Sequence, residues 1–227
     1  MPSRARRRVR AARKDEMNET RRRPTAPRTA PAARPNRVVD PRVRKAWDRL
    51  SAEIRACRKC PLGEVRTNAV VYRGGLAPRV LFVGEAPGTE EDRTGLPFVG
   101  RSGRELDRAV AALGLSDEQF GVLNVLKCRP PDNRFDRSAA RTCRPYLDRQ
   151  FDLLRPDVIV TLGARALAAV EPTAPPMLSA AGRPRDHGGT PYFPLIHPAA
   201  ALRSRRLRER WERDVRTLGR WLAERLA

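Results

Sequence analysis

The sequence has no apolar run of roughly 18–20 residues, the length that a membrane-spanning helix requires. Its N-terminus is rich in arginine but has no apolar segment behind it, so it does not match a secretory signal. The amphipathic helix of a mitochondrial transit peptide would be interrupted by Pro24, Pro27, Pro31 and Pro35. We therefore expect a cytoplasmic protein that does not act on membranes.

Acidic residues are few, since 26 Asp and Glu stand against 47 Lys and Arg, a net charge of +21. Such a chain is attracted to polyanions, so we expect it to associate with the nucleoid. Arginine-rich composition is also typical of GC-rich genomes, so charge alone does not establish DNA binding. Residues 1–40 hold 13 basic and 4 acidic residues and almost no large apolar ones. We predict a disordered basic tail there, either a DNA-tethering arm or an extension without a role.

Residues 41–227 are predicted to form one domain in which strands and helices alternate. The predicted strands are unbroken apolar runs at 79–84, 122–126, 156–161 and 192–196. The predicted helices carry apolar residues at helical spacing within 43–54, 102–113, 146–154, 164–170 and 207–222, and Ser102 is expected to cap the second. The segment 171–189, rich in Pro and Gly, is expected to be a long loop. This alternation predicts a three-layer α/β/α fold with a central, mainly parallel, four-stranded sheet.

Polar residues mark the ends of the predicted strands, where an open parallel sheet binds its ligands. Asn124 interrupts the second strand, and its amide either satisfies the main chain or matches the amide edge of a pyrimidine. His197 follows the fourth strand and is better placed for function than His187, the other histidine, which lies in the glycine-rich segment. Both strand ends therefore indicate a binding pocket.

A glycine-rich turn, Gly84-Glu-Ala-Pro-Gly88, follows the first strand and lets main-chain amides approach a ligand closely. No Gly-Lys-Ser/Thr follows, so the turn is not a P-loop, and the acidic residues 90–92 would repel a phosphate. A planar polar ligand with N–H donors fits better. Phe98 lies in the next Gly- and Pro-containing loop, where it either stacks on a base or belongs to the core.

Only four cysteines are present: Cys57 and Cys60 in a C-x-x-C turn, with Cys128 and Cys143 separated by 15 positions. In the cytoplasm such residues are metal ligands or core residues more often than disulfides. Neighbouring Lys and Arg residues would favour thiolates. The spacing alone leaves an iron–sulfur cluster and zinc open, although a zinc ribbon usually has two C-x-x-C turns.

Four sequence blocks occur in order: Cys-Arg-Lys-Cys at 57–60, Val-Gly-Glu-Ala-Pro-Gly-Thr-Glu-Glu-Asp-Arg-Thr-Gly-Leu-Pro-Phe-Val-Gly at 83–100, Asn-Val-Leu-Lys-Cys-Arg-Pro-Pro at 124–131 and His-Pro-Ala-Ala-Ala-Leu-Arg at 197–203. Over about residues 46–223 the chain resembles family 4 uracil-DNA glycosylases, the bacterial and archaeal iron–sulfur type. The resemblance implies a base-excision-repair enzyme that hydrolyses uracil from single- or double-stranded DNA and leaves an abasic site, and we expect it to be a monomer. It also implies a [4Fe-4S] cluster on Cys57, Cys60, Cys128 and Cys143.

The resemblance further implies roles for individual residues. Glu85 and His197 would be catalytic, with His197 near the sugar and uracil O2. The substrate pocket would comprise Gly84, Ala86, Pro87, Gly88, Glu91, Phe98 and Asn124. Within it, Phe98 would stack on the flipped base, Asn124 would read its amide edge, and Glu91 would shape the edge near C5 to exclude thymine. A loop over 199–203 would enter the DNA, with Leu202 or Arg203 filling the gap left by the base.

A related group crosslinks itself to uracil-DNA and shares much of this pattern. Its members carry Gln where Ala86 stands, and an inserted basic loop with a reactive His. Residues 129–141 hold no His, so we expect turnover without trapping. The alternative outside the enzymes is a non-catalytic iron–sulfur protein that binds DNA.

Overall fold

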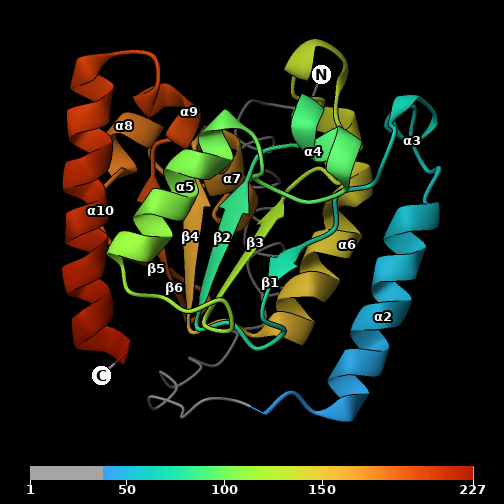
Figure 1. Ribbon diagram of the computed structural model, residues 1–227, viewed down its shortest axis with the longest axis horizontal. Coiled ribbons are helices and arrows are strands. Elements are labelled where there is room, and N and C mark those ends of the chain that lie inside the picture. The colour runs from blue at the N-terminus through green and yellow to red at the C-terminus, as the bar shows by residue number, and fades with distance from the viewer. Residues whose placement is uncertain (1–37, 227) are drawn as a thin grey trace, which may run out of the picture.

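The computed structural model describes residues 38–226, and Figure 1 shows a central sheet with helices on both sides. The predicted basic tail, residues 1–40, lies almost entirely outside the described residues. The strands are β1 (Arg73–Gly74), β2 (Val80–Gly84), β3 (Phe120–Asn124), β4 (Val158–Leu162), β5 (Arg185–His187) and β6 (Thr190–Leu195), arranged in the order β1-β3-β2-β4-β6-β5.

The four central strands, β3, β2, β4 and β6, run parallel, as the sequence predicts. The predicted number of strands is wrong, because β1 and β5 add antiparallel edges to β3 and β6. These edge strands are two and three residues long, too short to show a hydrophobic pattern. β5 and helix α8 (Met177–Ala180) also lie within 171–189, which we expected to be one loop.

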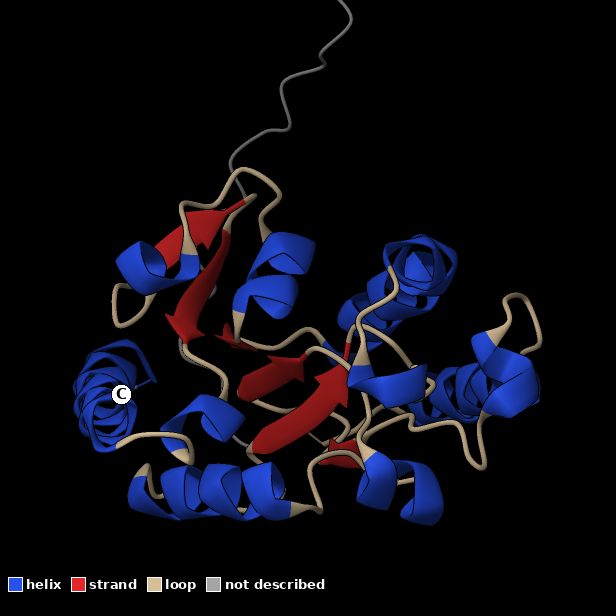
Figure 2. Ribbon diagram, turned by 90° about the horizontal axis from the view of Figure 1, so that it is seen from above, coloured by secondary structure: helices blue, strands red, loops and turns tan. Residues whose placement is uncertain are grey.

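Helices cover both faces of the sheet, which explains why every residue of β2, β3 and β4 is buried. The long helices are α2 (Pro41–Ala56), α5 (Arg101–Ala112), α6 (Arg137–Leu154), α7 (Ala164–Val170) and α10 (Arg205–Leu226). Successive strand residues point to opposite faces. Phe82 and Val160 therefore pack with α5 and α10, whereas Leu81 and Ile159 pack with α2, α6 and α7. Figure 2 shows these helical layers on the two sides of the sheet.

The connections hold short elements that the sequence pattern did not predict. They are α3 (Leu62–Val65), α4 (Thr89–Thr94), a 3₁₀ turn η1 (Pro131–Asn133) and α9 (Pro198–Ala201). The expected loop over 199–203 thus begins as a helical turn, because His197 caps the amide of Ala199. Ser102 does not cap α5, since that helix already begins at Arg101. No helix in the described region is long and apolar enough to cross a membrane.

Candidate active site

A cleft of about 410 Å³ lies at the carboxyl ends of the central strands. Its walls are formed by Glu85, Ala86, Pro87, Gly88, Glu91, Phe98, Ser102, Asn124, Asn133, His197, Ala199, Ala200 and Arg203. The structure therefore brings most of the predicted pocket residues into one cavity. Gly84 and Leu202 are predicted site residues that do not line it.

Asn124 is the last residue of β3 and is 1% exposed. Neither its Oδ1 nor its Nδ2 has a hydrogen-bond partner among the described residues. A buried amide without partners is unfavourable by about 1–3 kcal/mol for each group, so its retention indicates that a ligand supplies the missing bonds. The hypothesis that the Asn124 amide satisfies the main chain is therefore not supported by the structure.

Gly84 ends β2 beside Asn124 and acts by its small size. A Cβ at this position would lie 2.3 Å from Oδ1 of Asn124 and 2.5 Å from the ring of Phe98. Because neither side chain is free to retreat from a packed wall, only glycine allows both to face the cleft. Gly84 therefore does not line the cleft but makes room for the Asn124 and Phe98 side chains that do.

Phe98 belongs both to the hydrophobic core and to the cleft wall, so the two hypotheses for it are compatible. Its φ is +55°, an uncommon conformation for a residue with a side chain. Gly103 makes this possible, because a Cβ there would lie 2.0 Å from the carbonyl oxygen of Phe98. Such strain persists only where surrounding contacts enforce it.

His197 follows β6 and stacks on Phe98, with ring centroids 5.8 Å apart and planes at 29°. Its Nδ1 accepts a hydrogen bond of 3.1 Å from the amide of Ala199. Burial lowers the pKa of His197 to about 4, with Arg203 lowering it further and Glu91 opposing the shift. The ring is therefore neutral near pH 7. Since Nδ1 is an acceptor, Nε2 carries the proton and is the donor that the ring can offer.

Glu85 follows β2 and is half-buried in the cleft wall. Burial raises the pKa of its carboxyl above the usual 4.5, whereas the positive charge of Arg165 opposes that shift. Arg165 lies in the first turn of α7, with its guanidinium 5.3 Å from the ring centroid of Phe135. The sequence pattern gave no sign that Arg165 is near Glu85, because 80 positions separate them.

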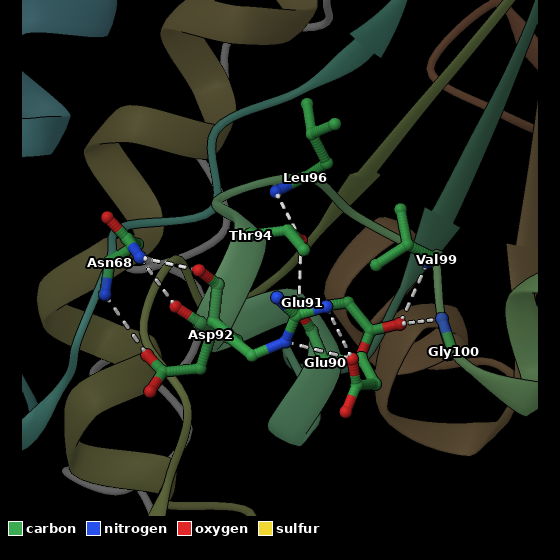
Figure 3. A network of polar contacts seen from close by, with 9 residues as sticks. Asn68, Glu90, Glu91, Asp92, Thr94, Leu96, Val99 and Gly100 are labelled. Atoms are coloured by element: carbon green, nitrogen blue, oxygen red, sulfur yellow. Dashed lines mark hydrogen bonds and ion pairs between the residues drawn. The ribbon is translucent and has the colours of Figure 1, made fainter.

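Glu91 lines the cleft, but its carboxylate is occupied by the main chain. It accepts hydrogen bonds of 2.9 Å from the amide of Val99 and 2.8 Å from the amide of Gly100 (Figure 3). It also accepts one of 3.1 Å from the amide of Gly88. Glu91 therefore holds two segments of the wall together.

The outer rim combines predicted and unpredicted residues. Arg203 lines the cleft and is exposed, whereas Leu202 is half-buried at the end of α9 and lies outside the lining. Ser102 reaches the cleft from the first turn of α5, and Asn133 from η1 with a φ of +54°. Neither follows a buried strand or belongs to an apolar stripe, so no periodic signal indicated them.

The four cysteines line one small cavity. Cys128 and Cys143 are buried, and Cys57 and Cys60 are half-buried. Burial raises the pKa of the Cys128 and Cys143 thiols. Among the described residues, no three His, Cys, Asp or Glu side chains are arranged to hold one metal ion.

Two cations lie against these cysteines. Arg66 donates to Sγ of Cys128 at 2.9 Å and to the carbonyl oxygen of Cys57 at 2.9 Å. Lys127 is fully buried and donates through Nζ to the carbonyl oxygen of Asn124. Burial lowers the pKa of Lys127 to about 7, and negative charge on Cys143 and Cys128 opposes that shift when these thiols ionise. The sequence showed Lys127 as a flanking charge but did not indicate Arg66.

A family model described as the uracil DNA glycosylase superfamily matches residues 71–217. A type-4 uracil-DNA glycosylase from Thermotoga maritima is 42% identical over 159 residues, which cover 69% of this chain and 83% of that relative. Type-4 enzymes from Archaeoglobus fulgidus and Sulfurisphaera tokodaii are 39% and 38% identical over 184 residues, covering 77% and 75% of this chain and 92% and 82% of the relatives. The chain belongs to the type-4 uracil-DNA glycosylases.

This membership confirms the resemblance seen in the motifs, and it implies an iron–sulfur cluster. Four thiols around a single cavity suit such a cluster, which needs no three side chains on one metal ion because each of its four irons takes one cysteine. Arg66 and Lys127 would offset the negative charge of the thiolates. The cavity lies between the C-x-x-C turn and the segment that carries Cys128 and Cys143.

Proposed function

We propose that this protein flips uracil out of DNA and hydrolyses its N-glycosidic bond, leaving an abasic site. The unpartnered amide of Asn124 at the buried end of β3 is the observation that carries the proposal. Its acceptor and donor match the N3–H and O4 of uracil, which would supply the missing bonds. The names of the type-4 relatives agree with this substrate.

The neutral ring of His197 is suited to stabilise the leaving group. When the bond between C1′ and N1 breaks, the electron pair leaves with uracil as an anion, with charge on O2. The N–H at Nε2 of His197 can donate a hydrogen bond to that oxygen without transferring its proton, while Nδ1 accepts from the amide of Ala199. Phe98 would support the base from its face.

Glu85 is suited to assist the water that completes the reaction. Water adds to C1′ through its oxygen and must lose one proton, which a carboxylate on the cleft wall can accept. Burial raises the pKa of Glu85 above 4.5, which makes its carboxylate a better base. Arg203 on the exposed rim would contact the DNA and fill the gap left by the flipped base.

We also propose that Cys57, Cys60, Cys128 and Cys143 hold a [4Fe-4S] cluster. When bound, the cluster supplies a crosslink between two segments that are distant in the sequence. We assign the cluster a structural role, since Glu85 would accept the proton of the attacking water and His197 would stabilise the leaving uracil anion. Iron and sulfide analysis with a visible absorption band tests this proposal, and a colourless, zinc-loaded protein would contradict it.

The test of function uses an oligonucleotide with a single uracil, followed by alkali to cleave any abasic site. We expect strand scission with the wild type and none when thymine replaces uracil. His197→Ala should lower the rate by about 100-fold or more, the usual effect of losing one anion-stabilising donor. No scission by the wild type would overturn the proposed function, and an equal rate for the variant would remove the role of His197. Adducts that persist on denaturing gels would indicate the self-crosslinking alternative.

A further inference from the structure

The short helix α4, Thr89–Thr94, carries two buried carboxylates side by side. Glu91 is 8% exposed and Asp92 is 7% exposed, whereas the preceding Glu90 is exposed and its carboxylate accepts from Arg93. Buried carboxylates are rare unless hydrogen bonds satisfy them. Both residues meet that condition through main-chain amides, and they do so on different sides of the helix (Figure 3).

On the cleft side, Glu91 joins the two segments that form the cleft wall. It accepts from Gly88 at the end of the glycine-rich turn, and from Val99 and Gly100 directly after Phe98. A Cβ on Gly88 would lie 2.8 Å from Oε2 of Glu91, so the main chain approaches this carboxylate unusually closely. The position of α4 therefore sets the position of Phe98 relative to the turn.

On the opposite side, Asp92 binds a turn that lies outside the cleft. Both of its carboxylate oxygens are 3.1 Å from the amide of Thr67, and Oδ1 is 3.4 Å from the amide of Asn68. Asn68 returns the contact, because its Nδ2 donates to the carbonyl oxygens of Asp92 at 2.8 Å and Arg93 at 3.1 Å. The turn therefore donates main-chain hydrogen bonds to a side chain of α4, and a side chain of the turn donates hydrogen bonds to the main chain of α4.

The turn is itself fixed to the cysteine site by the residue that precedes Thr67. Arg66 donates to Sγ of Cys128 and to the carbonyl oxygens of Cys57 and Ile54, at 2.9, 2.9 and 3.4 Å. One continuous series of hydrogen bonds and adjacent residues therefore runs from the cysteines through Arg66, the 67–68 turn and α4 to the cleft wall.

We propose that Asp92 is a positioning residue that aligns the cleft wall with the cysteine site through α4. Asp92 itself does not line the cleft, so it acts through Glu91, the next residue along the helix. Because α4 has only six residues, a shift on the Asp92 side moves the Glu91 side with it. This inference rests on the proposed function where its test measures uracil excision. The hydrogen-exchange measurement does not depend on that function.

The test compares Asp92→Asn with the matched control Glu90→Gln, which makes the same charge change on the exposed face of the same helix. Hydrogen exchange is measured on the purified holoprotein at the amides of Gly88, Val99 and Gly100. We expect faster exchange at these cleft amides in Asp92→Asn and no change in Glu90→Gln. Asn68→Ala is the second variant, since it removes the return bonds without altering any carboxylate.

Activity is measured as the single-turnover rate of uracil excision with enzyme in saturating excess. An unfolded fraction leaves this rate constant unchanged, so a purely structural role for Asp92 would not lower it. We expect a decrease of about 10- to 100-fold for Asp92→Asn, the size that small misplacements of reacting groups produce, and wild-type rates for Glu90→Gln. Unchanged exchange and an unchanged rate in both Asp92→Asn and Asn68→Ala would overturn the proposal. Absence of excision by the wild type would instead contradict the proposed function and leave the exchange result to decide this inference.

Discussion

At the scale of single residues, the cleft holds polar groups whose state is set by what surrounds them. Asn124 has no partner for either side-chain atom within residues 38–226, whereas His197 has its Nδ1 fixed by Ala199. Asn124 can therefore both accept from and donate to the amide edge of a base, whereas His197 offers one donor, the N–H at Nε2. Each arrangement leads to a measurement.

Asn124→Leu should separate binding from stability. Leucine has the same branching and the same number of side-chain heavy atoms, and it removes two unpaired buried polar atoms, so we expect a melting temperature equal to or above that of the wild type. Uracil excision should fall by about 100-fold or more, because the amide edge of the base loses its partners. A large loss of stability with normal excision would contradict the proposed role.

The pH dependence of excision should report Glu85 and not His197. Burial raises the pKa of Glu85 above 4.5, so its ionised form is lost at a higher pH than for an exposed carboxyl. The pKa of His197 is about 4, so its ring stays neutral across that range. We expect single-turnover rates to decline on the acid side, and Glu85→Gln to be slower and to lack this decline. An acid limb that survives in Glu85→Gln would assign it to another group.

At the scale of elements, the site depends on how closely the end of β2 approaches its neighbours. A Cβ on Gly84 meets Asn124 Oδ1 at 2.3 Å and the ring of Phe98 at 2.5 Å, so both side chains must shift together. By contrast, a Cβ on Gly219 in α10 meets only the tip of Leu113, at 3.3 Å. Two glycine-to-alanine substitutions should therefore have opposite consequences.

Gly84→Ala should lower both the excision rate and the melting temperature, since a packed wall has no room for the added methyl group. Gly219→Ala should leave the rate unchanged, and its stability should rise by up to about 1 kcal/mol because alanine favours a helix interior. Thermal unfolding and single-turnover excision measured on both variants check this pair. Normal excision by Gly84→Ala would show that the end of β2 is more adaptable than its contacts indicate.

At the scale of the whole molecule, a net charge of +21 governs encounter with DNA. Every protein cation placed on a phosphate releases counterions, so affinity falls as salt rises. Residues 1–40 contribute 13 of the 47 basic side chains, and their role stays a prediction because they lie almost entirely outside the described region.

Deleting residues 1–37 tests that role while keeping Asp40, whose carboxylate caps α2 through the amide of Arg42. If the tail is a DNA-tethering arm, affinity for an oligonucleotide should fall and the slope of log affinity against log salt should flatten. Excision at saturating enzyme should stay normal. An unchanged slope would show that the tail does not contact DNA.

Much of the fold and the candidate site could be predicted from the sequence, because their signals are local. The apolar runs identified all four central strands, and Asn124 and His197 stood at strand ends where parallel sheets bind ligands. Motif spacing indicated the four cysteines, which the structure places around one cavity. The family and the parallel order of the central strands are confirmed, while the individual catalytic roles stay predictions.

The sequence by itself determined the class of fold, the family and the chemical character of the cleft, since burial on both sheet faces requires apolar runs and each motif keeps its residues within a few positions. Only the tertiary structure decided which side chains from distant parts of the sequence come into contact. Arg66 reaches Cys128 across 62 positions, and the charge of Arg165 acts on Glu85 across 80. Such contacts leave no periodic trace, because they depend on the meeting of segments whose separation in the chain says nothing of their distance in space.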